Sequence, residues 1–139
     1  MNTVKEWLLR ATTVDTEISA LESELRSVSG RVYLGIKYGD KVQTERTNST
    51  EDAVNTYMKY SNKLLEKLQE LYSVKTEIAL VIFKVASERY RTLLELRYLN
   101  MLTWEKVAET MNIDERHIYR IHGEALKEVD EIMERGIKM

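Results

Sequence analysis

Apolar residues recur at alternating intervals of three and four along much of the chain, and no proline interrupts them. This spacing puts a narrow apolar row on a helix, and such a row needs a second helix to cover it. The first row consists of Val4, Trp7, Ala11, Val14, Ile18, Leu21, Leu25 and Val28. The second consists of Val54, Tyr57, Ser61, Leu64, Leu68, Leu71, Lys75, Ile78, Ile82 and Val85. The two rows predict an N-terminal antiparallel coiled-coil hairpin.

The segment between the rows, residues 29–49, breaks the pattern and holds Gly30, Gly35 and Gly39. We expect a connector loop there, with a short strand-like piece at "RVYLGI". It is either a solvated connector or a loop that contacts nucleic acid or a partner. The second helix is the longer one, so part of its row needs a further partner, either the C-terminal domain or a second copy. Residues 1–86 are therefore predicted to form a helical oligomerisation region.

Composition excludes several classes of protein. The chain has no cysteine, which rules out disulfides and cysteine metal sites and fits a reducing cytosol. Its longest apolar run, Ile78–Phe83, is far too short to cross a bilayer, so no membrane partner is expected. His117 and His122 lie five apart, on different sides of a helix, and no third metal ligand accompanies them. No catalytic set or phosphate-binding glycine loop stands out, so we expect no enzyme activity, no metal and no cofactor.

From Ser87 the pattern changes to short helices. Thr103 is placed to cap a short helix, "NI" forms a tight connection, and Asp114 caps a final helix over residues 115–134, with Gly136 as its stop. A short helix, a tight turn and a longer helix make a helix-turn-helix. We therefore predict an all-α protein in which residues 87–139 are a DNA-binding helix-turn-helix domain.

The final helix divides into two faces when its residues are placed at about 100° intervals. Ile118, Ile121, Ala125, Val129, Ile132 and Met133 fall on the inner face. Arg116, Arg120, Gly123 and Lys127 form a stripe on the outer face, flanked by Tyr119 on one side and by His117 and Glu124 on the other. Arginine pairs with guanine edges and with phosphate, and a glycine in the stripe allows a close approach. An ordinary solvated face also carries Arg and Lys, and acidic residues slightly outnumber basic ones after Ser87. One such domain should thus bind DNA weakly.

The stretch "ERYRTLLELRYLNMLTWEKVAETMNIDERHIYRIHGEALKEV" resembles region 4 of bacterial sigma factors, which reads the promoter −35 element. The shared landmarks are Leu96-Arg97-Tyr98, Thr103-Trp104, Val107-Ala108, Ile113, Ile118, Ile121 and Ala125-Leu126. The resemblance implies that Asp114, Glu115, Arg116, Tyr119 and Arg120 are the DNA-reading positions. Four of these positions differ from the residues common in sigma factors, so the −35 preference is not carried over. The sigma parts that bind the −10 element and melt DNA have no counterpart here.

The whole chain looks closer to a family of small sigma-like, or ArpU-like, regulators from phages and prophages of Gram-positive bacteria. Val42-Gln43-Thr44 and "YRIHGEAL", residues 119–126, carry that likeness. It implies transcriptional control of late phage genes in the cytoplasm of a bacterial host. The predicted DNA-contacting residues are Thr103, Lys106, Asp114, Glu115, Arg116, His117, Tyr119, Arg120, Gly123 and Lys127.

Three hypotheses follow for the function. The first is an oligomeric transcription regulator that binds double-stranded DNA. The second is a module that docks on RNA polymerase, with DNA contact secondary. The third is a subunit like the small terminase of phages, although the usual order in those proteins puts the DNA-binding domain first.

Overall fold

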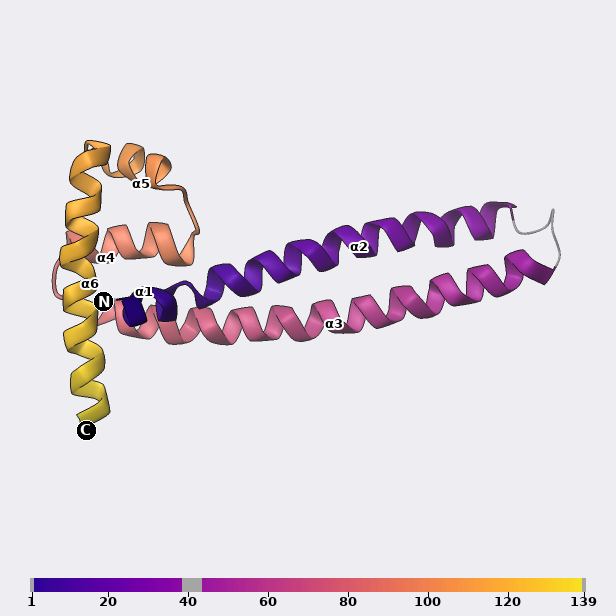
Figure 1. Cartoon of the computed structure of the whole chain (residues 1–139), viewed down its shortest axis with the longest axis horizontal. Coiled ribbons are helices and arrows are strands. Elements are labelled where there is room, and N and C mark those ends of the chain that lie inside the picture. Colours follow the sequence, from indigo (N-terminus) through magenta and orange to yellow (C-terminus); the bar gives the residue numbers. More distant parts are fainter. Residues whose placement is uncertain (1, 39–43, 139) are drawn as a thin grey trace. The chain divides into compact units, whose positions relative to one another are not determined.

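The computed structural model describes residues 2–38 and 44–138, and this part of the chain is helical, with no strand (Figure 1). The prediction of an all-α protein is confirmed at that level. The elements are α1 (Asn2–Leu8), α2 (Arg10–Tyr38), α3 (Thr44–Phe83), α4 (Glu88–Leu94), the π-helical segment η2 (Glu95–Leu99), α5 (Trp104–Met111) and α6 (Glu115–Lys138). None of the helices in the described ranges is long and apolar enough to cross a membrane.

The chain forms two compact units whose boundaries fall inside α2 and α3. One unit is Val14–Glu70, and the other joins the chain up to Thr13 with the chain from Leu71 onward. The domain boundary predicted from the sequence lies after Ala86 instead. The difference arises because α1 and the last turns of α3 contribute to the same apolar core as α4, α5 and α6. Val14–Glu70 is the central unit, and the other is the terminal unit.

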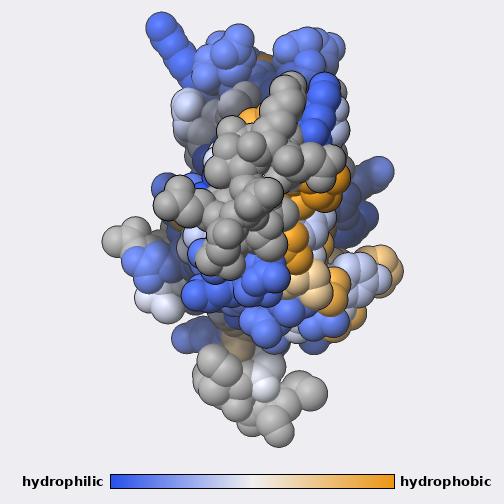
Figure 2. Space-filling model, turned by 90° about the vertical axis from the view of Figure 1, so that its right-hand side faces the viewer, coloured by the Kyte–Doolittle hydropathy of each residue, from blue (hydrophilic) through white to orange (hydrophobic). Residues whose placement is uncertain are grey.

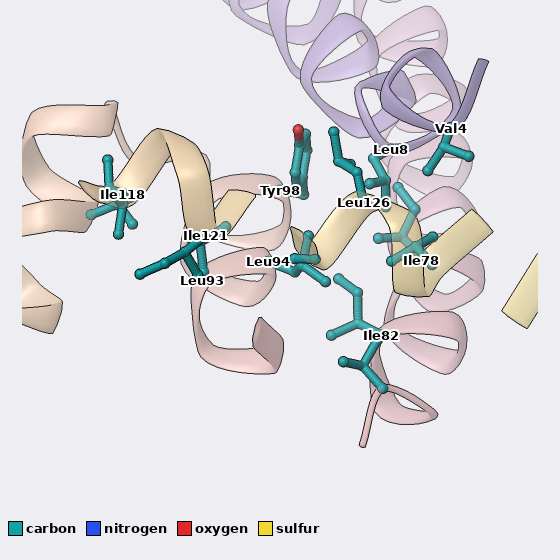
Figure 3. Close-up of a cluster of buried hydrophobic side chains, with 14 of the residues drawn as sticks. Val4, Leu8, Ile78, Ile82, Leu93, Leu94, Tyr98, Ile118, Ile121 and Leu126 are labelled. Atoms are coloured by element: carbon teal, nitrogen blue, oxygen red, sulfur yellow. The ribbon is translucent and has the colours of Figure 1, made fainter. Parts of the chain in front are cut away.

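The core of the terminal unit gathers side chains that are far apart in the sequence. Val4 and Leu8 of α1, together with Ile78 and Ile82 of α3, belong to one buried cluster with residues of the last three helices (Figure 3). The remaining members are Ala11, Val85, Leu93, Leu94, Tyr98, Val107, Ala108, Ile118, Ile121, Ala125, Leu126, Val129 and Ile132. A fully buried Leu or Ile side chain contributes about 1.5–3 kcal/mol, so this cluster holds the short helices in place.

The predicted loop over residues 29–49 is wrong where the backbone is described. α2 continues to Tyr38 and α3 begins at Thr44, so the expected strand-like piece at residues 31–36 is helical. Val28, the last predicted member of the first apolar row, is buried, and the partly buried Val32 extends that row by one residue. This packing offsets the cost of about 1 kcal/mol that Gly30 and Gly35 each impose on a helix. Residues 39–43 lie outside the described residues.

The first apolar row is correctly predicted, and every member from Val4 to Val28 is buried or partly buried. A small break occurs within it at Leu9, between α1 and α2, yet helical hydrogen bonding continues through Leu9 N to Lys5 O (2.9 Å) and Thr13 N to Leu9 O (3.0 Å). The helix is therefore almost continuous from Asn2.

Within the central unit, segments of α2 and α3 lie side by side and antiparallel. Glu17 of α2 pairs with Lys67 of α3 at 2.7 Å. Further along α2, Ser29 and Val32 line one hollow together with Val54 and Tyr57 of α3. Later residues of α2 therefore lie beside earlier residues of α3, as they do in an antiparallel pair. Bonds from the Lys67 ammonium to Glu17 and Glu70 raise the pKa of that group. Both side chains reach solvent, so water and salt screen this pair.

The second apolar row is only partly correct. Val54 is 39% exposed and Leu68 is 44% exposed, whereas Ala53 is buried and Lys67 partly buried. In the central unit, α3 carries apolar residues on two adjacent faces, and spacing alone does not say which face meets α2.

Candidate nucleic-acid interface

The start of α5 and the connection to α6 are fixed by caps. The Thr103 hydroxyl accepts a hydrogen bond from Lys106 N at 3.2 Å, as predicted. Asn112 ends α5 in the left-handed conformation (φ 56°), and Ile113 N then donates to Ala108 O at 3.0 Å. The side chain of Asp114 accepts from Arg116 N at 3.4 Å, while its carbonyl accepts from Ile118 N at 3.0 Å. These bonds fix a sharp three-residue connection between α5 and α6.

α6 is longer than expected and strongly two-faced. It continues through Gly136, whose φ is not positive, so the predicted stop at that glycine is wrong. Its inner face packs against α1, α4 and α5. Ile118, Ile121, Ala125, Leu126, Val129 and Ile132 are buried on that face. The opposite face is left for solvent.

Every predicted DNA-contacting residue lies at the surface of the terminal unit. Thr103, Lys106, Asp114, Glu115, Arg116, Tyr119, Arg120 and Lys127 are exposed, and His117 and Gly123 are partly exposed. The Tyr119 ring lies 5.5 Å from that of Trp104, centroid to centroid, which brings the first turn of α5 beside the outer face of α6. A Cβ built on Gly123 would meet nothing within 4 Å, so this spot is open rather than packed.

Two arginines converge on His117. Arg120 Nη2 lies 2.7 Å from His117 Nε2, and Arg89 Nη2 lies 3.4 Å from the same atom. A guanidinium only donates hydrogen bonds, so Nε2 is the acceptor and the ring proton belongs on Nδ1. Arg89, in the first turn of α4, was missed by the sequence analysis, because no helical spacing links it to α6.

The acidic flank of α6 is engaged by neighbouring elements. The Tyr90 hydroxyl donates to Glu124 Oε2 at 2.8 Å, and Ala86 N donates to Glu128 Oε1 at 2.8 Å. The bond to Glu124 is the main reason why the pKa of Tyr90 is raised. These carboxylates therefore anchor α6 to the start of α4.

A network of polar and aromatic side chains packs against the middle of α6 at the buried His122. The Tyr98 hydroxyl and His122 Nε2 are 2.6 Å apart, and the Trp104 ring meets the His122 ring edge-on at 4.4 Å. Arg97 lies over the Trp104 ring at 4.6 Å and donates from Nη1 to Leu102 O at 2.8 Å. His122 is a packed residue, since it is 7% exposed.

Burial sets the charge state of this network. It raises the pKa of Tyr98 to about 12. Desolvation, with smaller contributions from Lys5 and Arg97, lowers the pKa of His122 to about 4. His122 is therefore neutral near pH 7 and forms a structural support rather than a cationic contact. Among the described residues, no group of three or more His, Cys, Asp or Glu side chains is placed to hold a metal ion.

Residues 11–131 match the model of a family described as a protein of unknown function (DUF722). The chain belongs to the DUF722 family. The matched region of this DUF722 chain contains α3, α4, α5 and the basic outer face of α6. Neither the curated proteins nor the solved structures contain a match to the sequence.

Proposed function

We propose that this protein binds double-stranded DNA by placing the outer face of α6 in the major groove, and that it regulates transcription. One observation carries the proposal. Arg116, Arg120 and Lys127 are exposed on one side of α6, and within the described part of the chain no carboxylate lies within 4.0 Å of their charges. Cations without a carboxylate partner are suited to phosphate oxygens and to guanine edges.

The arrangement of α5 and α6 is compatible with this role. A helix-turn-helix needs a sharp connection, a second helix held firmly on its inner side, and a free outer side near the N-terminus of that helix. The left-handed Asn112 and the Asp114 cap supply the connection. The buried isoleucines of α6 supply the inner contact. The resemblance of residues 88–129 to sigma region 4 points in the same direction and supports a role at promoters of phage genes.

Binding to duplex DNA tests the proposal directly. We expect the protein to shift labelled duplex DNA in a gel at low salt, and to select a preferred sequence from a random duplex pool. The double variant Arg116→Ala with Arg120→Ala should lose the preferred-site complex, because both charges lie on the proposed reading face. Arg135→Ala, which removes an exposed arginine from the far end of α6, is the matched control. Specific binding that survives the double variant would contradict the assignment of α6.

A second candidate function is docking on RNA polymerase, with DNA contact secondary. The net charge of −2 favours it, because a strongly DNA-binding chain is usually basic. Tyr119, 51% exposed beside Trp104, offers an aromatic contact for a protein partner. A pull-down of RNA polymerase from host extract, with Tyr119→Ala as the comparison, separates the two candidates. Polymerase capture without any duplex binding would favour docking.

A further inference from the structure

The convergence of Arg89 and Arg120 on one histidine nitrogen is unusual for two cations. Their Nη2 atoms lie 3.4 Å and 2.7 Å from His117 Nε2, so one neutral acceptor serves two guanidinium groups. All three side chains are at the surface, and His117 is the least exposed of them.

The local carboxylates do not compensate these charges. On that flank of α6, Glu124 accepts a hydrogen bond from the Tyr90 hydroxyl, and Glu128 accepts one from Ala86 N. The ion pairs of the described residues involve neither Arg89 nor Arg120. Two like charges that are held together and have no directly paired carboxylate form a site suited to an anion.

We infer that Arg89 and Arg120 together bind one phosphate of the DNA backbone in place of His117 Nε2, and that Arg89 is a DNA-contacting residue. This inference rests on the proposed function. A phosphate presents acceptor oxygens to both guanidinium forks, which a single imidazole nitrogen cannot do. His117 holds the two arginines close together until the phosphate replaces it as their acceptor. Because the arginines come from α4 and α6, the contact fixes the terminal unit on the duplex while Arg116 faces the groove.

A phosphate contact has a distinct signature in binding experiments. It carries no sequence information, and each neutralised phosphate contributes about 0.9 to the slope of log affinity against log salt concentration. We expect Arg89→Ala to weaken binding to a short duplex of arbitrary sequence and to the selected duplex by the same factor, roughly fivefold to tenfold. The salt slope, measured by fluorescence anisotropy between roughly 50 and 200 mM, should fall by about 1.

Comparison variants make the outcome decisive. Arg89→Lys keeps the charge but loses the fork, so we expect an intermediate loss with a nearly unchanged salt slope. Arg135→Ala should match the wild-type protein in both measurements, and circular dichroism should show the same helix content for every variant. Arg116→Ala should weaken binding to the selected duplex more than to the arbitrary one.

The two proposals fail in different ways. If Arg89→Ala leaves affinity and salt slope unchanged while the Arg116 and Arg120 double variant loses specific binding, the phosphate site is overturned and the proposed function stands. A loss confined to the selected duplex would mean that Arg89 reads a base, which also overturns the phosphate site. If the wild-type protein binds neither duplex, the proposed function and this inference are both overturned.

Discussion

His122 links the stability of the terminal unit to pH. Its pKa is about 4 in the folded protein against an ordinary value of 6.5, so the unfolded chain binds the proton more readily. The stabilisation is complete above about pH 6.5 and is lost as pH falls toward 4. One such proton changes the free energy of unfolding by up to about 1.4 kcal/mol per pH unit in that window. Urea unfolding between pH 7 and pH 5 measures this slope.

The matched variants separate burial from hydrogen bonding. His122→Gln has no titrating group, so we expect it to lower stability at pH 7 and to flatten the slope. Tyr98→Phe removes the hydroxyl 2.6 Å from His122 Nε2 but leaves the histidine buried, so the slope should persist. An unchanged slope in His122→Gln would show that another group causes the acid sensitivity.

Gly123 offers a substitution that should affect folding and DNA binding in opposite directions. A Cβ there meets nothing within 4 Å, so Gly123→Ala should stabilise α6 by about 1 kcal/mol and raise Tm by a few degrees. The added methyl group would nonetheless stand on the proposed DNA-facing surface and weaken duplex binding. Gly136→Ala, another helical glycine of α6 with open space around it, is the control and should leave DNA affinity unchanged. Equal affinities for both variants would place Gly123 outside the interface.

At the scale of the elements, the connection between α5 and α6 depends on one backbone conformation. Asn112 has φ 56°, a region that Asn and Gly tolerate better than other residues. We expect Asn112→Gly to be nearly neutral and Asn112→Ala to cost about 1 kcal/mol in thermal or urea unfolding. A variant that moves α5 against α6 should also weaken DNA binding. Equal stabilities of the two variants would indicate that the left-handed turn contributes little.

Thr103 and Asp114 were predictable caps because a cap acts on backbone atoms only a few residues away. The helix over residues 31–36 was not predictable, since its glycines favour a loop and only the packing of Val28 and Val32 outweighs them. The place of Val4 and Leu8 in the core of α6 was also hidden, because heptad spacing does not identify the partner helix. Arg89 reaches His117 only through the fold, and spacing along one helix could not reveal it.

At the scale of the whole molecule, exposed apolar side chains on α3 suggest self-association. Four apolar side chains of α3 are exposed by 39%, 55%, 58% and 44%: Val54, Met58, Leu65 and Leu68. Together with Ser61 they recur at intervals of four and three, and we call these five residues the outer row of α3. Figure 2 shows apolar patches beside hydrophilic surface on the face of the molecule that it presents. The row contains no charged residue, so two copies could pack it together without burying like charges. We therefore expect a second copy of the chain to cover it.

Self-association should depend on that row and should strengthen DNA binding. Light scattering at micromolar concentration should show an oligomer for the wild-type protein, and the double variant Leu65→Glu with Leu68→Glu should be a monomer, because each copy would bring two like charges into the contact. Lys63→Glu, which places the same residue at an exposed position off the row, should remain oligomeric. The monomeric variant should also bind duplex DNA more weakly, since one domain neutralises few phosphates and two linked domains bind with a higher effective concentration. A wild-type protein that is monomeric at that concentration would contradict the second copy, and DNA binding by this chain would then rest on a single terminal unit.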